Sequence, residues 1–585
     1  MSGAEPGHRA DPVVTEIIRS GVIAVTEEMK TNLMRTAYNH IIYEALDFTT
    51  GLFNARGETV SIGLGLPMFI RGMAETLKAK IAHFGMDDIK PGDILVTNDG
   101  YITGSHLNHV TLSLPIFHEG KLVAFAVCMA HWLTIGGNIG GMTTDIFSEG
   151  LQIPILKLQR KGVINQDLLD IIKINVHLPE RAMGDLRAQL TAVRTGERRF
   201  SELLDRYGQD EVLGAIDDIM DQSERAARER TLSIPDGTYE AESFMDDDGV
   251  DIGKHIPIKV KVIVAGDRMT VDLSNVSKQV RGFYNSGPTT GYGASQVAFK
   301  CLTSPTDYPI NDGSFRGLEV INPPGRVVSA VRPAPMRSWM TIPMTVVDTI
   351  FKALAPAIPD RVIAGHFADL GNATLFGYVP DEGRMIITSS GPIGGGWGAK
   401  MTEDGVSATV CINDGDTHNS PVELMETKYP IVFERYGLVP DSGGAGRFRG
   451  GLGSQSAVRL RKDLNFSTRI ERMHCPPWGL EGGQDGFGNL VELDMVGVDN
   501  PKMVNAKVFT ARLKAGDLFR VRGGGGGGFG PAWERPAEKV QEDVRQGYVT
   551  LESAKANYGV LLDPGTLEID HEETGKLRAQ LAAAA

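Results

Sequence analysis

Cysteine is scarce in this sequence, and the four cysteines that occur lie far apart. Cys128, Cys301, Cys411 and Cys475 form no C-x-x-C pair within the 585 residues. Their spacing excludes a cysteine zinc finger and argues against a disulfide framework, so we expect reduced thiols and a cytoplasmic protein. The start "MSGAEPGHRADP" lacks the basic and then apolar pattern of a signal peptide. No apolar run reaches about 18 residues, so we expect no membrane span.

Basic residues are also in deficit. The chain has 59 Lys and Arg against 73 Asp and Glu, a formal net charge of -14, and no Lys/Arg-rich run. Nucleic acid and anionic membrane surfaces are therefore not expected partners. Two enzyme signatures are missing as well: no G-x-S-x-G nucleophile elbow occurs, and no G-x-x-x-x-G-K-[ST] phosphate loop. The chain gives no support for a serine hydrolase or for its own ATP site.

Glycine, in contrast, is abundant. The 70 glycines exceed the roughly 41 that average usage of about 7% would give. Several lie in runs such as "GPIGGGWGAK", "SGGAGRFRGGLG" and "VRGGGGGGFGP". Proline and tryptophan follow the last run, where a nucleotide-binding loop would begin a helix. We therefore expect turns and flexible or closely packed backbone there, and much β structure in this part of the chain.

The order of predicted elements indicates an α+β fold in several layers. The length suggests three or four domain-sized units. Apolar spacing predicts helices over 11–45 and 69–84 and mostly helical structure over 165–230, whereas alternation predicts hairpins around 55–58 and 265–267. We expect four regions: a helix-rich N-terminal α+β region with a metal-site hairpin (1–234), a central β-rich α+β region (235–440), a β- and glycine-rich region (441–535), and C-terminal helices with a polar tail (536–585).

Three histidines are concentrated in one predicted hairpin. "TGSHLNHVTL" carries His106 and His109, and "CMAHW" carries His131 at the end of the second strand. Neutral imidazole is the commonest metal ligand, so the cluster is a candidate metal site. Strand-end histidines that are hydrogen-bonded to backbone would give the same pattern, and the pattern alone leaves both interpretations open.

Hairpin register decides which histidines can share a face. If Phe117 pairs with Leu122, regular antiparallel pairing brings Asn108 opposite His131. Because side chains alternate faces, His109 then lies on the opposite face from His131. A bend near the loop, or a turn one residue shorter, would return His109 to that face.

The regular register therefore favours His106 and His131 as a metal pair. Carboxylates can also bind a metal, and Asp47 is the most interesting of them because it lies where a predicted helix ends and a predicted strand begins. Three other carboxylates could serve a metal or act as a base, although each is equally typical of a turn, cap or surface position: Asp99, Glu423 and Glu426.

The order of motifs along almost the whole chain resembles the hydantoinase B family. The motifs are "TEEMKTNLMRTA" with "EALDFTTGLF", "NDGYITGSHLNHVTL", "MAHW", "EGLQIP", "NSPVELMETKYP", "DSGGAGRFRGGLG" and "GGGGGGFGP" followed by "VQEDVRQGYVTLESAKANYGV". That family includes the second subunits of ATP-dependent hydantoinases and lactamases, the C-terminal part of 5-oxoprolinases, and a subunit of acetone and acetophenone carboxylases.

The resemblance implies a divalent metal of the zinc, manganese or iron class. Carried over by position, the ligands are Asp47, His106, His131 and the residue at position 109. The family usually has aspartate where this chain has His109, and a second aspartate where it has Thr134. Both changes remove negative charge. His109 can still bind a metal, or the site can be an altered one.

The resemblance also implies a hetero-oligomer in which a hydantoinase A-like partner binds ATP and Mg²⁺. We expect the B-type component of an ATP-dependent cyclic amide hydrolase, acting on a hydantoin, lactam or oxoproline-like ring. A ketone carboxylase subunit is the alternative. A third interpretation is a non-catalytic assembly subunit whose metal site has degenerated.

Overall fold

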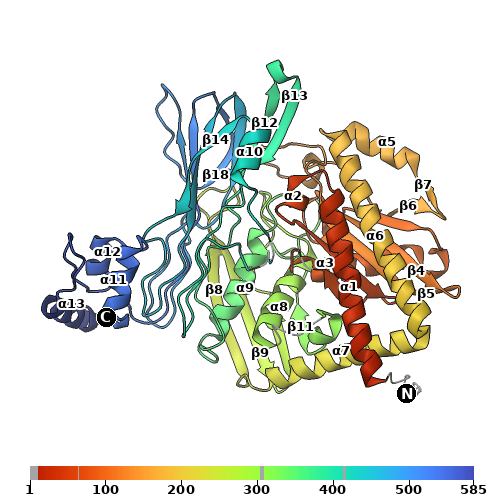
Figure 1. The fold of residues 1–585 in the computed structure, drawn as a ribbon, viewed down its shortest axis with the longest axis horizontal. Helices are drawn as coiled ribbons and strands as arrows, with labels where there is room; N and C mark the ends of the chain where they lie inside the picture. Colours follow the sequence, from red (N-terminus) through yellow and green to blue (C-terminus); the bar gives the residue numbers. More distant parts are fainter. Residues whose placement is uncertain (1–10, 64, 304–308, 413–414, 416, 585) are drawn as a thin grey trace.

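The computed structural model describes residues 11–63, 65–303, 309–412, 415 and 417–584. Its helices and sheets form an α+β fold, as predicted (Figure 1). The first ten residues, which make up most of the segment that lacks a signal-peptide pattern, lie outside the described residues. Within those ranges, no helix combines the length and apolar character needed to cross a membrane.

The N-terminal part is built on a seven-stranded antiparallel sheet. Its strand order is β2-β1-β5-β4-β3-β6-β7. The strands are β1 (Phe48–Asn54), β2 (Thr59–Gly63), β3 (Ile94–Thr97), β4 (His109–His118), β5 (Lys121–His131), β6 (Leu156–Arg160) and β7 (Val163–Ile164). Both faces of the central strands β1, β4 and β5 are buried, because helices cover the sheet on each side.

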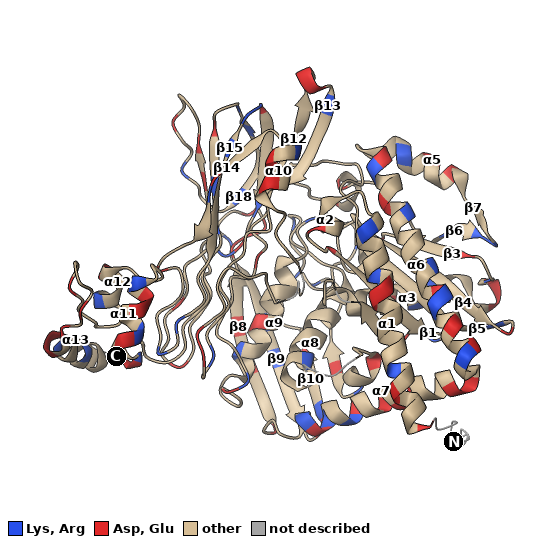
Figure 2. Ribbon diagram, in the orientation of Figure 1, with Lys and Arg blue, Asp and Glu red and all other residues tan. Residues whose placement is uncertain are grey.

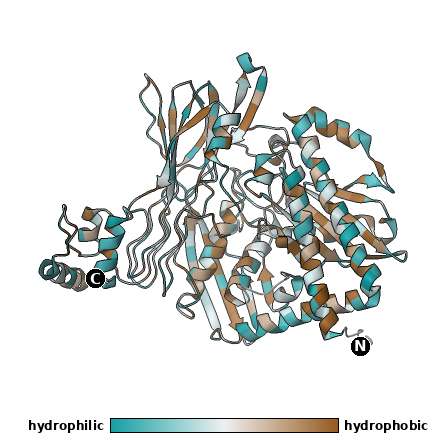
Figure 3. Cartoon of the chain, viewed as in Figure 1, coloured by the Kyte–Doolittle hydropathy of each residue, from teal (hydrophilic) through white to brown (hydrophobic). Residues whose placement is uncertain are grey.

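Helices α1 and α6 cover one face of this sheet, and α3 covers the other (Figure 1). The helices of this part are α1 (Pro12–Thr36), α2 (His40–Tyr43), α3 (Phe69–Phe84), α4 (Gly100–Thr103), α5 (Gln166–Asn175), α6 (Pro179–Tyr207) and α7 (Gln209–Thr231), with short 3-10 turns at Met86–Asp88 and Ile146–Ser148. Lys, Arg, Asp and Glu line the outer sides of α6 and α7, which are amphipathic (Figures 2 and 3).

The first helix is shorter than predicted. Asp11 caps α1 by accepting hydrogen bonds from Val13 and Val14, as the sequence indicated, but the helix ends at Thr36 and not near residue 45. The next segment leaves the helix because Asp185 accepts the backbone N–H groups of Tyr38 and Asn39. The helix therefore ends at Thr36, although the helical spacing of apolar residues continues beyond it. The predicted helix at 69–84 matches α3.

A second, four-stranded sheet follows in the order β11-β10-β9-β8. Its strands are β8 (Gly237–Met245), β9 (Ile256–Ala265), β10 (Arg268–Asp272) and β11 (Leu318–Ile321), packed against α8 (Pro288–Thr303) and α9 (Thr341–Leu354), with a 3-10 turn at Asp312–Phe315. The predicted hairpin at 265–267 is β9–β10. One hydrophobic core joins α8, α9 and this sheet to α3 and the N-terminal sheet.

Two further four-stranded sheets, β13-β12-β16-β18 and β14-β15-β19-β17, share a core. The ring centroids of Phe466 and Phe519, one from each sheet, lie 4.7 Å apart. The elements are β12 (Ala373–Val379), β13 (Arg384–Ser389), α10 (Val422–Lys428), β14 (Ile431–Leu438), β15 (Ser454–Leu460), β16 (Leu464–Arg469), β17 (Leu490–Asp494), β18 (Lys507–Leu513) and β19 (Leu518–Arg522), with a 3-10 turn at Pro380–Glu382.

The glycine run after β19 is buried backbone packed against other glycine-rich segments. Gly526 donates to the carbonyl of Gly451 and accepts from Gly444, at 2.9 and 2.8 Å. A Cβ at Gly526 would lie 1.9 Å from the carbonyl oxygen of Trp397. The neighbouring chains approach so closely that only glycine fits there, so this run is a structural element and not an open phosphate loop.

The C-terminal helices form a lobe beside this glycine-rich layer (Figure 1). They are α11 (Ala537–Arg545), α12 (Leu551–Ala556) and α13 (His571–Ala584), after a 3-10 turn at Ala532–Glu534. The lobe has a small core of its own. The sequence indicated only a polar tail after residue 559, whereas the structure has α13 there.

Candidate metal centre

The three histidines and Asp47 meet at one end of the N-terminal sheet. Asp47 lies between α2 and β1, His106 in the loop before β4, His109 at the start of β4, and His131 at the end of β5. The backbone N–H of His131 donates to the carbonyl of Asp47 at 3.1 Å. Asn39 adds a hydrogen bond to the carbonyl of His131 at 3.0 Å. The ends of central strands and a short helix thus converge on the cluster.

The observed register corrects the predicted one. Phe117 pairs with Leu122 as expected, but the ladder then shifts by one residue between Ile116 and Phe117. Because of this bulge, His109 lies directly opposite His131. A one-residue shift moves a side chain to the other face of the sheet, so His109 shares the face of His131. The prediction that they lie on opposite faces is wrong.

The imidazole rings are close enough to act on one ligand. Ring centroids are 4.5 Å apart for His106 and His109, 5.0 Å for His106 and His131, and 5.1 Å for His109 and His131. Trp339 and Phe69 pack against the cluster, with Phe69 at 4.5 Å from the His109 ring. One ring nitrogen of each histidine is enclosed and lacks a hydrogen-bond partner among the described residues: His106 Nε2, His109 Nδ1 and His131 Nδ1.

Asp47 supplies the negative charge of the cluster. His109 Nε2 donates to Asp47 Oδ1 at 3.0 Å. Burial alone would raise the pKa of Asp47, but the charge and hydrogen bond of His109 outweigh it, so that pKa is lowered. Burial lowers the pKa of His131 to about 4 and that of His106 well below its usual value. His106 and His131 are therefore neutral near pH 7, which is the state that binds metal.

His106 is oriented by a second layer of hydrogen bonds. Its Nδ1 donates to the carbonyl oxygen of Arg337 at 3.2 Å, which leaves the lone pair on Nε2. The backbone at Arg337 is fixed in turn by Glu149, whose carboxylate accepts the N–H groups of Met336 and Arg337 at 3.0–3.1 Å. Thr143 donates to the same carboxylate at 2.7 Å. "EGLQIP" marked this glutamate in the sequence, but nothing there indicated its role.

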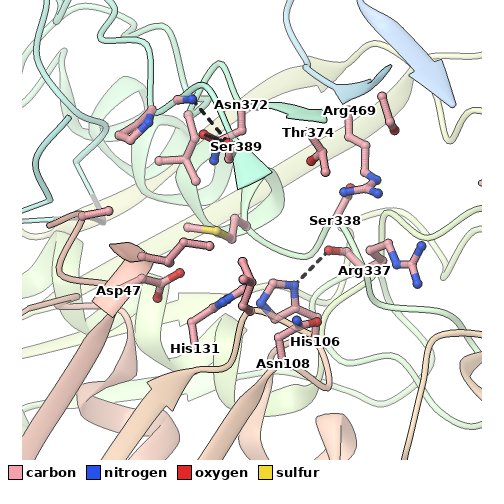
Figure 4. Close-up of a pocket in the computed structure, with 18 of the residues that line it drawn as sticks. Asp47, His106, Asn108, His131, Arg337, Ser338, Asn372, Thr374, Ser389 and Arg469 are labelled. Atoms are coloured by element: carbon pink, nitrogen blue, oxygen red, sulfur yellow. Dashed lines mark hydrogen bonds between the residues drawn. The ribbon is translucent and has the colours of Figure 1, made fainter. Parts of the chain in front are cut away.

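A cavity of about 250 Å³ lies over the cluster and is called the pocket below. Its floor includes Asp47, His106 and His131, and its roof comes from the distant strands β12, β13 and β16 (Figure 4). The labelled roof residues are polar: Asn372, Thr374, Ser389 and Arg469. The pocket therefore faces a ligand with imidazoles on one side and hydrogen-bonding groups on the other.

Of the other candidate site residues that the sequence singled out, only Thr134 lines the pocket. Its hydroxyl pairs with Nδ1 of His177 at 2.8 Å. Asp99 caps α4 and pairs with Arg332, away from the pocket lining. Glu423 and Glu426 lie on α10, where Glu426 accepts the N–H of Phe433.

Sequence reasoning missed one further histidine of the pocket. His40 lines it, and burial lowers its pKa to about 4. The Nε2 atom of His40 has no partner among the described residues. It lies in α2, outside the hairpin that carried the spacing signal.

The donor types of the cluster suit a divalent metal, but its geometry does not surround one. In the described ranges, no group of three or more His, Cys, Asp and Glu side chains is placed so that it could hold an ion. The bond between His109 and Asp47 occupies one candidate donor of each. Three imidazoles and one carboxylate are nevertheless the ligand types that zinc and similar cations prefer.

Known sequences are similar to this one over nearly its whole length. A family model described as hydantoinase B/oxoprolinase matches residues 11–532. The chain is 30% identical to the B component of a putative D-/L-hydantoinase from Pseudomonas sp. (strain NS671), with 97% of this chain and 98% of that one aligned. It is 32% identical to the beta subunit of the caprolactamase of Pseudomonas jessenii, with 97% and 99% aligned.

Solved structures share the fold. A crystal structure of the ATP-dependent caprolactamase from Pseudomonas jessenii superposes with a TM-score of 0.91 at 28% identity, covering 98% of this chain and 100% of that one. The nucleotide-free structure of an acetone carboxylase also gives a TM-score of 0.91, at 19% identity, covering 98% and 83%. At that lower identity the likeness shows the fold alone.

Proposed function

The chain belongs to the hydantoinase B/oxoprolinase family, and from this premise we propose that it is the B-type component of an ATP-dependent cyclic amide hydrolase. The substrate is a hydantoin, a lactam or an oxoproline-like ring. The observation that carries the proposal is the end-to-end similarity to the B component of a hydantoinase and to the beta subunit of a caprolactamase. The names of both relatives describe one subunit of a larger enzyme, so we assign this chain a partner subunit.

The partner is an A-type subunit that binds ATP and Mg²⁺. The chain lacks a phosphate-loop motif, and its longest glycine run is committed to buried backbone packing. The chain therefore has no recognisable phosphate loop, and its longest glycine run has no room for ATP. The pocket over the histidines is then the place where this chain meets the amide.

We assign the metal to Asp47, His106, His109 and His131, which requires His109 and Asp47 to exchange their mutual hydrogen bond for the ion. A divalent cation of the zinc, manganese or iron class would supply Lewis acidity toward an amide carbonyl or an oxygen nucleophile. The chain's own contribution is orientation: Glu149 fixes the backbone at Arg337, and the carbonyl of Arg337 fixes the ring of His106. The roof residues hold the rest of the ring substrate.

The two rivals fit the observations less well. The likeness to acetone carboxylase extends to the fold alone, so it does not favour a ketone substrate. A degenerate assembly subunit has no need of the unpartnered imidazole nitrogens of His106 and His131 in the lining of one cavity, with that of His109 beside them, because orphaned buried polar atoms destabilise a fold. Bound ligands compensate that cost, and the pocket provides room for them.

Activity assays with the complete enzyme test the proposal. The chain is purified with its A-type partner and supplied with MgATP and hydantoin, a lactam or 5-oxoproline, in the absence of bicarbonate. We expect ring opening that depends on ATP and on both chains. Turnover that occurs only with a ketone and bicarbonate would instead establish the carboxylase, and the hydrolase proposal would fall.

Metal content tests the centre independently of turnover. Elemental analysis of the wild type should find about one divalent ion per chain, and the His106→Ala and His131→Ala variants should lose it. His109→Ala should bind metal more weakly because one ligand is lost, whereas His109→Asp should retain it because a carboxylate replaces the imidazole. His118→Ala, in the same hairpin but paired with Asp205, is the matched control. Full metal in His109→Ala would show that His109 is not a ligand.

A further inference from the structure

One cation in the roof of the pocket has no counter-ion among the residues that the structure describes. Arg469, the last residue of β16, extends toward Ser338 and the side on which His106 lies (Figure 4). Its one hydrogen bond within the described ranges is from Nη2 to the carbonyl of Ile139, at 2.7 Å. Its Nε is enclosed and unpartnered there. The ring of Phe283 lies 5.6 Å from the guanidinium.

A second guanidinium, that of Arg337, lies nearby and also lacks a carboxylate partner among the described residues. Arg337 also lines the pocket, its Nη1 has no partner among the described residues, and its Nη2 makes only a long contact of 3.5 Å with the carbonyl of Glu149. Burial lowers the pKa of both arginines, and the charge of Arg337 lowers that of Arg469 further, to about 9. Two like charges therefore share one low-dielectric site.

The carboxylates near these arginines are already engaged. Glu149 accepts from two backbone N–H groups and a threonine hydroxyl. Asp369, also in the pocket lining, accepts the N–H groups of Leu370, Gly371 and Glu471. In the described part of the chain, neither carboxylate lies within ion-pair distance of Arg469 or Arg337.

Three other buried cations each pair with a carboxylate, whereas the fully buried Lys80 is held by two backbone carbonyls and the hydroxyl of Ser113. Arg472 pairs with Asp348 at 3.0 Å, Arg535 with Asp404 at 2.7 Å, and Lys507 with Glu471 at 2.6 Å. A buried charge without such a partner is strongly unfavourable. Lys80 has three oxygen partners, whereas Arg469 has one side-chain hydrogen bond, an unpartnered Nε and a place in the lining of the pocket. A site completed by an anionic ligand requires this combination.

We propose that Arg469, with Arg337 nearby, binds an oxyanion of the ligand on the side of the pocket opposite Asp47. The guanidinium fork suits a carboxylate or a phosphate group. The assignment of the source rests on the proposed function: an ATP-dependent ring opening offers a phosphate group from ATP and the carboxylate that hydrolysis of the amide releases. Both are oxyanions, and the experiment distinguishes them.

The test measures anion binding to the full 585-residue chain after metal removal, by calorimetry at low ionic strength, with inorganic phosphate in one arm and acetate in the other. We expect at least one of the anions to bind. Arg469→Met should weaken that binding by about tenfold or more, the loss of a charge-assisted hydrogen bond, and Arg469→Lys should be intermediate. Arg459→Met, a surface arginine paired with Glu434, should bind as the wild type does.

Thermal unfolding separates a ligand-binding arginine from a structural one. Removing an unpaired buried charge should leave the melting temperature of Arg469→Met at or above the wild-type value. Arg472→Met should melt well below it, because the buried Asp348 loses its guanidinium partner. A loss of stability in Arg469→Met equal to that of Arg472→Met would overturn the proposal, since the residue would then be structural.

The binding outcomes also decide the source. Binding of phosphate alone supports a phosphoryl group, binding of acetate alone supports the product carboxylate, and binding of both supports a general oxyanion site. Absence of binding to the wild type, or equal binding to Arg469→Met, overturns the inference. If Arg469 binds an anion and the complete enzyme opens no cyclic amide, the site stands and the proposed function fails.

Discussion

Asp185 is a buried carboxylate that fixes the path from α1 to the histidine cluster. Its Oδ1 accepts the N–H groups of Tyr38 and Asn39, at 2.8 and 3.1 Å, and Asn39 in turn contacts the carbonyl of His131. The second oxygen, Oδ2, has no partner among the described residues. Burial raises the pKa of Asp185 to about 7, against the opposing effect of the two N–H groups.

This raised pKa makes the stability of the fold depend on pH. The folded state holds a proton on Asp185 more tightly than the unfolded chain does, so the contribution to stability is complete below about pH 4 and is lost as the pH rises toward 7. Asp185→Asn keeps the acceptor and stays neutral. We expect the variant to be more stable than the wild type by about 2–4 kcal/mol at pH 8, and equal to it near pH 4.

Denaturant unfolding at pH 4, 6 and 8 measures this difference. Asp499→Asn, at an exposed position, serves as the control and should track the wild type at all three values. If Asp185→Asn is less stable than the wild type at pH 8, the carboxylate is charged in the folded protein and the assignment is wrong.

At the scale of single elements, the hairpin shows how far sequence patterns reach. The alternation of apolar and polar residues correctly predicted β4, β5 and the pairing of Phe117 with Leu122. It could not locate the one-residue bulge beside Ile116, because a bulge depends on how the strand fits its neighbours. The bulge carries His109 to the face of His131, so a local irregularity decided the composition of the cluster.

The glycine run is the second element whose nature the sequence left open. Flexible backbone and tight packing both favour glycine, and the structure shows tight packing. Gly526→Ala should therefore destabilise the protein by about 1–3 kcal/mol or more, as overpacking does, because its Cβ would collide with the carbonyl of Trp397. Gly437→Ala is the matched control, since a Cβ there meets nothing within 4 Å.

Thermal unfolding of the two alanine variants measures the effect. Gly437→Ala should melt within a degree or two of the wild type, in line with the small effects of surface substitutions. If Gly526→Ala has the same melting temperature as Gly437→Ala, the glycine-rich layer can accommodate a methyl group, and its glycines serve flexibility.

At the scale of the whole molecule, the sequence predicted the α+β class but not the composition of the pocket. The floor lies within residues 47–131, where motif and resemblance both pointed. The roof comes from residues more than 200 positions away in the chain, including Asn372 and Arg469. No local pattern marks such residues, because their role arises only when distant layers pack together.

The C-terminal lobe is joined to the rest of the molecule through a buried ion cluster. Arg535 donates to both carboxylate oxygens of Asp404, at 2.7 and 2.8 Å, and to Asp543 of α11 at 3.0 Å. Burial alone would raise the pKa of Asp404, but Arg535 outweighs it and lowers that pKa, so the carboxylate stays charged at a pH where an ordinary aspartate begins to take up a proton. Arg535 thus links the lobe to the glycine-rich layer.

Removing this arginine should release the lobe. Arg535→Met leaves Asp404 without its ion-pair partner and Asp543 with only Arg449, at 3.6 Å. This should cost about 3–5 kcal/mol and expose α11–α13 to exchange and proteolysis. Hydrogen exchange by mass spectrometry should show faster exchange in residues 537–584, while β4 and β5 keep their protection. Arg545→Met, a surface arginine paired with Glu542 on the same helix, should leave the lobe protected. Uniformly faster exchange across the chain would contradict local release, and would mean that the lobe and the sheets unfold as one unit.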